Sequence, residues 1–502
     1  MPAEVTMADS AIFISSLAIN SATLAAQAAP VPWLGAAFAT LTVLKDMIIK
    51  AKANKSALGQ LRDRCSAFLS VIEAHGGSAP PEEQKELALD AERTIRGVVE
   101  RMRPWCSMSA VKLFIKQDEV ASEVQDCHSQ INDCMTRLQI TAALEAQGWQ
   151  VSFKSNLEDD RRAMLEYLSD TSNVQNIILQ TVQQSSKDLK TLMGFMQQNL
   201  PNTSGGSNSG LEANLYELHK SSKTMLANMN LKSGEVRRIG KYPVSGTHTM
   251  DIWEGIYLNE EKVAIKIIRS VHAGPRSLQR FTREVEIWRS VWEVDQGRHI
   301  VPLYGFCQID GPFPYVVSPW MPHGTVDHYV KQHPDVDHRA LIKHIAEGVN
   351  LLHTMAPPIV HGDIRGANIV IDGVGNPLLS DFGFSRIIED ITGVAITQST
   401  GILDSQRWAA RELCLGGKLT TKADVYSFGM TVLELMTHQK PWPRIRLPHQ
   451  VVLKVADGAM PPRPLDDLAV DRGLDDRLWE LLLRCWDEPE KRPTMAEVLT
   501  LL

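Results

Sequence analysis

The most informative stretch of this chain is His361-Gly362-Asp363-Ile364-Arg365-Gly366-Ala367-Asn368, which is followed by Asp381-Phe382-Gly383. An aspartate therefore precedes an asparagine by five positions, and a second aspartate stands directly before a Phe-Gly pair. Upstream, the apolar run Val263-Ala264-Ile265-Lys266 predicts a strand that ends in a lysine, and Glu284 lies in a helical stretch beyond it. Four further segments follow in order: Arg407–Glu412, Asp424–Gly429, Cys485-Trp486 and Lys491–Thr494.

Together these segments resemble the protein kinases, and most closely the tyrosine-kinase-like group, over residues 236–502. Trp408 and the Cys485-Trp486 pair favour that group, whereas His-Gly-Asp in place of His-Arg-Asp departs from the family pattern. The resemblance implies an α+β bilobal fold over residues 232–502, with a smaller lobe at 232–318 and a larger lobe at 322–502. It also implies ATP and Mg²⁺ as cofactors and a protein as substrate.

The resemblance assigns a role to each polar residue of the motifs. Asp363 would accept the proton of the substrate hydroxyl, and Arg365 would contact the transferred phosphate unless it is a plain surface arginine. Mg²⁺ would be held by Asn368 and Asp381. The nucleotide phosphates would be positioned by Lys266, which an ion pair with Glu284 would orient.

The resemblance also locates the adenine site and the phosphate loop. Ser318 would lie at the back of the pocket, Pro319 and Met321 would offer a carbonyl and an N–H to adenine, and Ala264 and Val370 would enclose the ring. The glycine-rich loop should cover residues 245–252 and bring Gly246 and Ile252 to the nucleotide. Its three glycine positions hold Ser245, Thr247 and Met250, so side chains should hinder close approach to phosphate, unless a short insertion shifts the register.

The activation segment is the second place where the chain departs from the family. Gly362 stands where many kinases have the arginine that clamps a phosphorylated activation loop. Phosphorylation within residues 385–406 should therefore not act through that contact, and regulation should come from elsewhere in the chain. At the end of the segment, Arg411 replaces the usual proline, and Glu412 is predicted to pair with Arg492.

Length and composition limit the class of protein. A chain of 502 residues with 44 % apolar residues is too long for one domain and can form two cores. Its net charge of −7 argues against a general nucleic-acid binder. Seven scattered cysteines without a CxxC pair, and no Lys or Arg before Lys45, favour free thiols and a cytoplasmic location, with peripheral membrane attachment as the other option.

The first 150 residues predict an all-α helical bundle. No charged residue occurs in Ser10–Leu44, which favours a buried bundle helix, with reversible membrane insertion as the alternative. Beyond it, Leu58 to Ile72 and Leu87 to Met102 are amphipathic. A seam at spacings of four and three predicts a packed helix with both cysteines in the core: Val120, Val124, Cys127, Ile131, Cys134 and Leu138.

The segment between the bundle and the kinase-like region divides into two predicted parts. Residues 151–200 should form one long brace-like helix, running from near Leu157 to Asn199. Residues 201–231 should contain a flexible linker at Asn202–Gly210 and a short helix from Leu211 to Leu231, because the linker is composed of Gly, Ser, Asn and Thr.

The whole layout resembles the mixed-lineage-kinase-domain-like proteins, in which the bundle is the effector and the kinase domain is a switch. Partners implied by this layout are a copy of the chain itself, another protein, or an anionic membrane surface. Six basic residues could meet lipid head groups or could simply be a solvated helix face: Lys45, Lys50, Lys52, Lys55, Arg62 and Arg64.

Three functional hypotheses follow. The favoured one is an active protein kinase, most readily serine/threonine-specific, with a helical regulatory domain, because Asp363, Asn368, Asp381, Lys266 and Glu284 are all present. The second is a pseudokinase that gates a membrane-disrupting bundle. The third is a scaffold in which the bundle docks a partner and catalysis is vestigial.

Overall fold

The chain forms two compact units in the computed structural model, one ending at Thr224 and one beginning at Met225. The structure describes residues 32–51, 53–138, 148–182, 186–200, 207–231, 234–246, 250–268, 275–307, 315–382, 405–464 and 467–502. Residues 10–29 of the uncharged N-terminal stretch therefore lie outside the described residues. Among the helices that are described, none is long and apolar enough to cross a bilayer.

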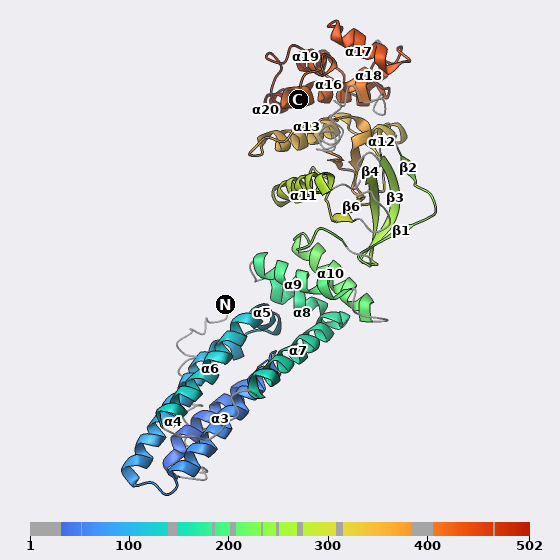
Figure 1. Cartoon of the computed structure of the whole chain (residues 1–502). Coiled ribbons are helices and arrows are strands. Elements are labelled where there is room, and N and C mark those ends of the chain that lie inside the picture. Colours follow the sequence, from blue (N-terminus) through green and yellow to red (C-terminus); the bar gives the residue numbers. More distant parts are fainter. Residues whose placement is uncertain are drawn as a thin grey trace, which may run out of the picture. The chain divides into compact units, whose positions relative to one another are not determined.

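Long helices build the first unit (Figure 1). Their apolar faces form one core, in which the predicted core residues Cys127 and Cys134 are fully buried. The predicted seam is confirmed, since Val120, Val124 and Ile131 are buried with them. The helices are α2 (Gly35–Lys50), α3 (Lys55–Gly76), α4 (Pro81–Cys106), α5 (Ala110–Ile115) and α6 (Gln117–Arg137), preceded by η1 (Pro32–Leu34).

The predicted basic patch is smaller than expected. Arg64 is only 8 % exposed, and its guanidinium donates to the side-chain carbonyl of Asn132 at 2.6 Å. Arg62 pairs with the neighbouring Asp63 at 2.8 Å. Lys45, Lys50 and Lys55 are exposed, whereas Lys52 lies outside the described residues. A buried, bonded guanidinium cannot meet a lipid head group, so Arg64 does not belong to such a patch.

The single long brace helix predicted over residues 157–199 is wrong. The chain instead forms α7 (Gly148–Ser169), η2 (Thr171–Asn173), α8 (Val174–Val182) and α9 (Ser186–Asn199). The break occurs because the Asp170 carboxylate accepts the backbone N–H and the hydroxyl of Ser172, at 2.9 and 2.7 Å. Asp170 therefore acts as the N-cap of η2, so a new helical segment begins here instead of α7 continuing.

The helix after the predicted linker begins and ends earlier than the predicted range of Leu211 to Leu231. Helix α10 (Ser207–Ser222) includes the last part of the predicted linker, while residues 201–206 lie outside the described residues. Asn214 of α10 is buried, and its side-chain amide donates to the carbonyls of Leu168 and Asp170 at 2.7 and 3.1 Å. These bonds satisfy carbonyls at the end of α7, so α10 packs on the break between α7 and α8.

An antiparallel sheet and helix α11 (Pro275–Asp295) form the smaller lobe of the second unit. The strand order is β1-β3-β4-β6-β5, with β2 paired to β3. Residues before the predicted start of this domain belong to the same core, since Met225 and Met229 pack with Phe306. The strands are β1 (Val236–Ile239), β2 (Ser245–Gly246), β3 (Met250–Tyr257), β4 (Glu261–Ile268), β5 (Gly305–Cys307) and β6 (Tyr315–Pro319).

The larger lobe is mainly helical and carries a small hairpin of β7 (Ile369–Ile371) and β8 (Pro377–Leu379). Its core surrounds α16 (Thr421–Thr437), which is buried along most of its length. The other helices are α12 (Val326–Gln332), α13 (His338–Thr354), α15 (Arg411–Cys414), α17 (Pro448–Ala456), α18 (Asp467–Asp471), α19 (Asp476–Cys485) and α20 (Met495–Leu501), with η4 (Gly366–Asn368) and η6 (Ser405–Trp408). The predicted fold class, a helical N-terminal part with an α+β bilobal domain, is confirmed.

Candidate active site

The loop between α13 and β7 holds the first predicted pair of polar residues in direct contact. The side-chain nitrogen of Asn368 donates to the backbone carbonyl of Asp363 at 2.8 Å and to its carboxylate Oδ2 at 2.7 Å. The five-residue spacing therefore closes a short loop around the carboxylate. Because the nitrogen of Asn368 is used in this way, its amide oxygen is the atom that can bind a metal.

Lys266 in β4, two residues before the strand ends at Ile268, and Asp381 just after β8 form the second pair. The ammonium nitrogen lies 2.7 and 2.8 Å from the two carboxylate oxygens, and the side chains are only 12 % and 14 % exposed. Asp381 is linked to the first pair, because the backbone N–H of Ser380 donates to the carbonyl of Asn368 at 2.9 Å. Lys266, Asp381, Asn368 and Asp363 thus form one connected polar site.

The partner of Lys266 differs from the predicted one. The resemblance implies an ion pair with Glu284, whereas the described contact of Lys266 is with Asp381. Glu284 belongs to α11, but its side chain lies outside the described residues. The orienting role of Glu284 therefore stays a prediction.

Arg365 lies beside the predicted base. Its Nε is 3.3 Å from Oδ2 of Asp363, and the guanidinium carbon lies 6.0 Å from the centre of the Trp408 ring. The side chain is 17 % exposed, which does not fit a plain surface arginine. A fixed positive charge at this position can stabilise negative charge next to Asp363.

Asp424 in α16 holds the backbone of the catalytic loop from below. Its carboxylate accepts the N–H of His361 at 2.7 Å and that of Gly362 at 2.9 Å. The ring Nε2 of His353 lies 3.0 Å from the same carboxylate. The sequence pattern predicts an aspartate in a helix below the loop, but not which groups it binds.

Sequence reasoning missed Glu434, a second buried acid of α16. Its Oε2 accepts the N–H of Gly366 at 2.9 Å and the indole N–H of Trp408 at 3.1 Å. Burial raises the pKa of Glu434 to about 7, with Asp327 adding to the increase and the two hydrogen bonds opposing it. A single glutamate within an apolar helical run was the available signal, because such a residue needs a bonded partner when buried.

The Phe382 ring packs against helix α11, which sequence reasoning also missed. The indole N–H of Trp288 donates to the carbonyl of Phe382 at 2.9 Å, and the two ring centres are 5.0 Å apart. The ring centres of His361 and Phe382 are 6.4 Å apart, and burial lowers the pKa of the His361 imidazole. A small cavity of about 20 Å³ remains next to Lys266, Trp288 and Phe382.

The predicted adenine residues lie on β4, on β6 and the residues that follow it, and on β7. Ala264 of β4 pairs with Ser318 of β6, and Pro319 ends β6. Val370 lies in β7 and bridges Thr325, and the carbonyl of Met321 accepts the N–H of Gly324 at 3.2 Å. The adenine-binding role of these residues stays a prediction.

The residues predicted to form the phosphate loop include β2 and the start of β3. Ser245 pairs with Ile252, Gly246 pairs with Asp251, and Ile252 pairs on its other side with Lys266. Residues 247–249 at the tip lie outside the described residues.

The ion pair predicted at the end of the activation segment is confirmed. The Arg492 guanidinium is 1 % exposed and donates to both carboxylate oxygens of Glu412 at 2.6 and 2.8 Å. The preceding Arg407 donates to four carbonyls of the loop that follows α16. Residues 383–404 lie outside the described residues, so their predicted phosphorylation chemistry stays a prediction.

A sheet lobe and a helical lobe, joined by the residues after β6, carry the Asp363–Asn368 and Lys266–Asp381 pairs, and this combination defines a protein kinase domain. The family model of protein tyrosine and serine/threonine kinases matches residues 244–502. The chain therefore belongs to the protein tyrosine and serine/threonine kinase family.

The chain is similar to protein kinases of several organisms over about half of its length. It is 31 % identical over 268 residues to a dual specificity protein kinase of Dictyostelium discoideum, which covers 48 % of this chain and 10 % of the relative. A tyrosine-protein kinase of Spongilla lacustris is 30 % identical over 264 residues, and the match covers 50 % of this chain and 71 % of the relative. A serine/threonine-protein kinase of Arabidopsis thaliana is 28 % identical over 257 residues, and the match covers 50 % of this chain and 42 % of the relative.

Proposed function

We propose that this chain is a Mg²⁺-dependent protein kinase that transfers the γ-phosphate of ATP to hydroxyl groups of proteins, with a preference for serine and threonine. The carrying observation is the connected set of Asp363, Asn368, Asp381 and Lys266, in which each residue has a partner within the site. The N-terminal unit regulates this activity in the proposal.

The donor set at the site fits Mg²⁺. This ion prefers oxygen ligands, and the Asp381 carboxylate and the amide oxygen of Asn368 supply them. A bound Mg²⁺ ion would supply positive charge that offsets the negative charge of the nucleotide phosphates. Lys266 would then exchange its bond to Asp381 for one to phosphate, since both acceptors compete for the same ammonium group.

Asp363 acts as the base in this proposal. The side-chain amide of Asn368 donates to Oδ2 of Asp363, which leaves Oδ1 to accept the hydroxyl proton of the substrate. The Asp424 bonds to His361 and Gly362 fix the backbone on which this carboxylate is mounted. Arg365 places its charge next to the same carboxylate, where the transferred phosphoryl group would pass.

The test is phosphate transfer by the full chain. Wild-type protein should gain thermal stability with Mg·ATP and transfer radiolabelled phosphate to a generic basic protein. Asp363→Asn should reduce transfer by about 10²-fold or more, because it removes the base. Lys266→Met should weaken both nucleotide binding and transfer. The exposed residues Asp335 and Lys331 provide matched controls as D335N and K331M.

Either of two results would overturn the proposal: no transfer by the wild-type chain, or full transfer by both active-site variants. Phosphoamino-acid analysis of the product then decides the acceptor. Phosphoserine and phosphothreonine support the proposed preference, and phosphotyrosine alone contradicts it.

A second candidate function is supported by two observations. The sequence has Ser245, Thr247 and Met250 at the positions where the predicted phosphate loop would have glycines. Three lysines near the start of the described chain are exposed: Lys45, Lys50 and Lys55. In this alternative the nucleotide site is a switch, and the helical unit contacts anionic membranes. Leakage of phosphatidylserine vesicles by the full chain, lost in K45E/K50E/K55E, would support it. Equal leakage by both proteins would contradict it.

A further inference from the structure

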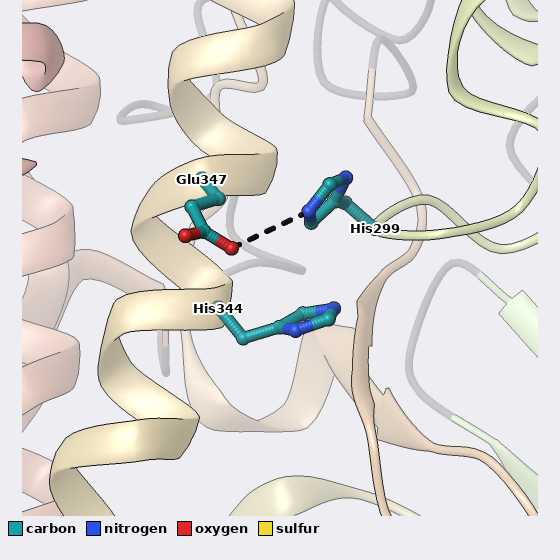
Figure 2. A group of neighbouring side chains, drawn as sticks. All are labelled: His299, His344 and Glu347. Atoms are coloured by element: carbon teal, nitrogen blue, oxygen red, sulfur yellow. Dashed lines mark ion pairs between the residues drawn. The ribbon is translucent and has the colours of Figure 1, made fainter.

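Among the residues that the structure describes, one group of side chains outside the active site has the composition of a metal site. It consists of His299, His344 and Glu347, whose candidate ligand atoms all lie within 4.8 Å of one another. Figure 2 shows His344 and Glu347 extending from α13 toward His299, which lies in the segment after α11. All three side chains are partly exposed, so an ion from solution can reach them.

Each histidine ring is held by a hydrogen bond through one of its two nitrogens. Nδ1 of His299 lies 2.8 Å from Oδ1 of the buried Asp295, and Nε2 of His344 lies 2.8 Å from the carbonyl of Arg298. Each of these nitrogens must carry a proton to donate to its acceptor. The other nitrogen of each neutral ring then holds the lone pair that a metal needs, as in the carboxylate–histidine–metal arrangement.

The backbone around His299 is fixed as well. The carboxylate of Asp295 accepts the backbone N–H groups of His299 and Ile300, both at 2.9 Å. Helix α13 approaches closely, because a Cβ on Gly348 would lie only 3.1 Å from Cβ of His299. The remaining contact within the group is between Nε2 of His299 and Oε2 of Glu347, at 3.5 Å. This contact is long for a hydrogen bond, so His299 and Glu347 are near each other without being tightly bonded.

We propose that His299, His344 and Glu347 bind one Zn²⁺ ion, with a water molecule as the fourth ligand. Two imidazoles and one carboxylate suit this borderline cation, whose bonds of about 2.0–2.2 Å need only a small closing movement of the three side chains. This proposal goes beyond the kinase activity and does not depend on it.

The position of the ion gives it a structural consequence. The carbonyl of His299 accepts the N–H of Leu379 at 2.8 Å, and Leu379 lies two residues before Asp381. Zn²⁺ would therefore clamp the segment after α11 to α13, next to the strand that leads into the active site. Binding to the folded state alone raises stability, so the melting temperature should increase with Zn²⁺ concentration.

The experiment uses tag-free, chelator-treated full chain and ZnCl₂ as the probe. Calorimetric titration should show one high-affinity site in the wild type, and the melting temperature should rise by several degrees. His344→Ala and Glu347→Gln should each weaken that site by at least about tenfold, because each removes a ligand. His449→Ala, an exposed histidine on α17, should change neither measurement. Co²⁺ should give the visible absorption of a four-coordinate ion in the wild type and lose it in both ligand variants.

Circular dichroism without metal should show that the variants fold like the wild type, since both side chains are partly exposed. The proposal is overturned if the wild type shows no high-affinity Zn²⁺ site. It is equally overturned if His344→Ala and Glu347→Gln bind Zn²⁺ as tightly as the wild type, because the ion would then be held elsewhere, for example by cysteine.

Discussion

Gly362 is the residue at which this chain departs from the usual catalytic loop, and its backbone has φ +81°. Its N–H donates to Asp424, so the loop cannot easily rotate to another conformation. We predict that Gly362→Ala lowers the free energy of unfolding by about 1–2 kcal/mol, because a side chain is strained in this region. Gly373→Ala is the control, since the nearest atom to its added Cβ would lie at 3.8 Å. Equal melting temperatures for both variants would contradict this account.

Glu434 should make stability depend on pH. Its carboxyl has a pKa of about 7 in the folded chain against 4.5 as the ordinary value, so the folded state binds more protons between these limits. Stability from this group is therefore present at low pH and is lost as pH rises through about 7. The loss should be on the order of 3 kcal/mol.

Glu434→Gln should remove this part of the pH dependence, because the amide oxygen can still accept from Gly366 and Trp408 but cannot titrate. Denaturant unfolding between pH 4.5 and 8 measures it. The stability of the wild type should fall relative to the variant as pH rises, and parallel curves would show that Glu434 does not titrate in this range.

At the scale of elements, the Arg492–Glu412 pair joins α15 to the turn before α20. Because Arg492 is 1 % exposed, loss of either partner leaves an uncompensated charge in a poorly solvated place. We predict that Glu412→Ala or Arg492→Ala costs about 3–5 kcal/mol. A double-mutant cycle should give a coupling of about 1–3 kcal/mol.

The neighbouring Arg411–Glu488 pair provides the comparison, since its side chains are 39 % and 50 % exposed. Solvent screens such a pair, and the same cycle should give less than about 1 kcal/mol. Similar coupling in the two cycles would mean that burial does not control the strength of these contacts.

The elements that the sequence predicts best are those whose pattern is local. The seam from Val120 to Cys134 follows from spacing alone and is confirmed. The strand that contains Lys266 is confirmed as well, although it continues to Ile268 instead of ending at the lysine. The prediction of one brace helix was wrong because the apolar periodicity continues past Asp170. The backbone N–H of Ser172 donates to the Asp170 carboxylate, and the helix ends there. Four consecutive polar residues, Asp-Thr-Ser-Asn, within a long helical pattern indicate a turn even where the apolar periodicity continues.

The active site also contains residues that a local sequence pattern predicts and contacts that it does not predict. Asp363, Asn368, Asp381 and Lys266 carry a spacing that predicts their proximity, and the structure brings them together. The contacts of Trp288 with Phe382 and of Glu434 with Gly366 join residues far apart in the sequence. No local pattern contains that information, because it arises only from packing of the helices against the loop.

At the scale of the whole molecule, the division into two units places residues 225–231 with the kinase domain rather than with the linker. The backbone there forms an added strand-like contact, in which the N–H of Leu231 donates to the carbonyl of Phe306 and the N–H of Phe306 donates to that of Met229. Met225, Met229 and Leu231 are each at most 5 % exposed. A domain boundary drawn at residue 232 would therefore remove part of the small-lobe core.

We predict that a protein of residues 225–502 unfolds in one cooperative transition and that one of residues 232–502 is several kcal/mol less stable. Each buried side chain lost contributes about 1.5–3 kcal/mol, and Phe306 also loses its backbone partners. Urea unfolding of the two proteins measures the difference, and removal of residues 225–231 should also lower the cooperativity of the transition in the small lobe. If both proteins unfold at the same urea concentration, residues 225–231 contribute nothing to the kinase domain and its core begins at β1.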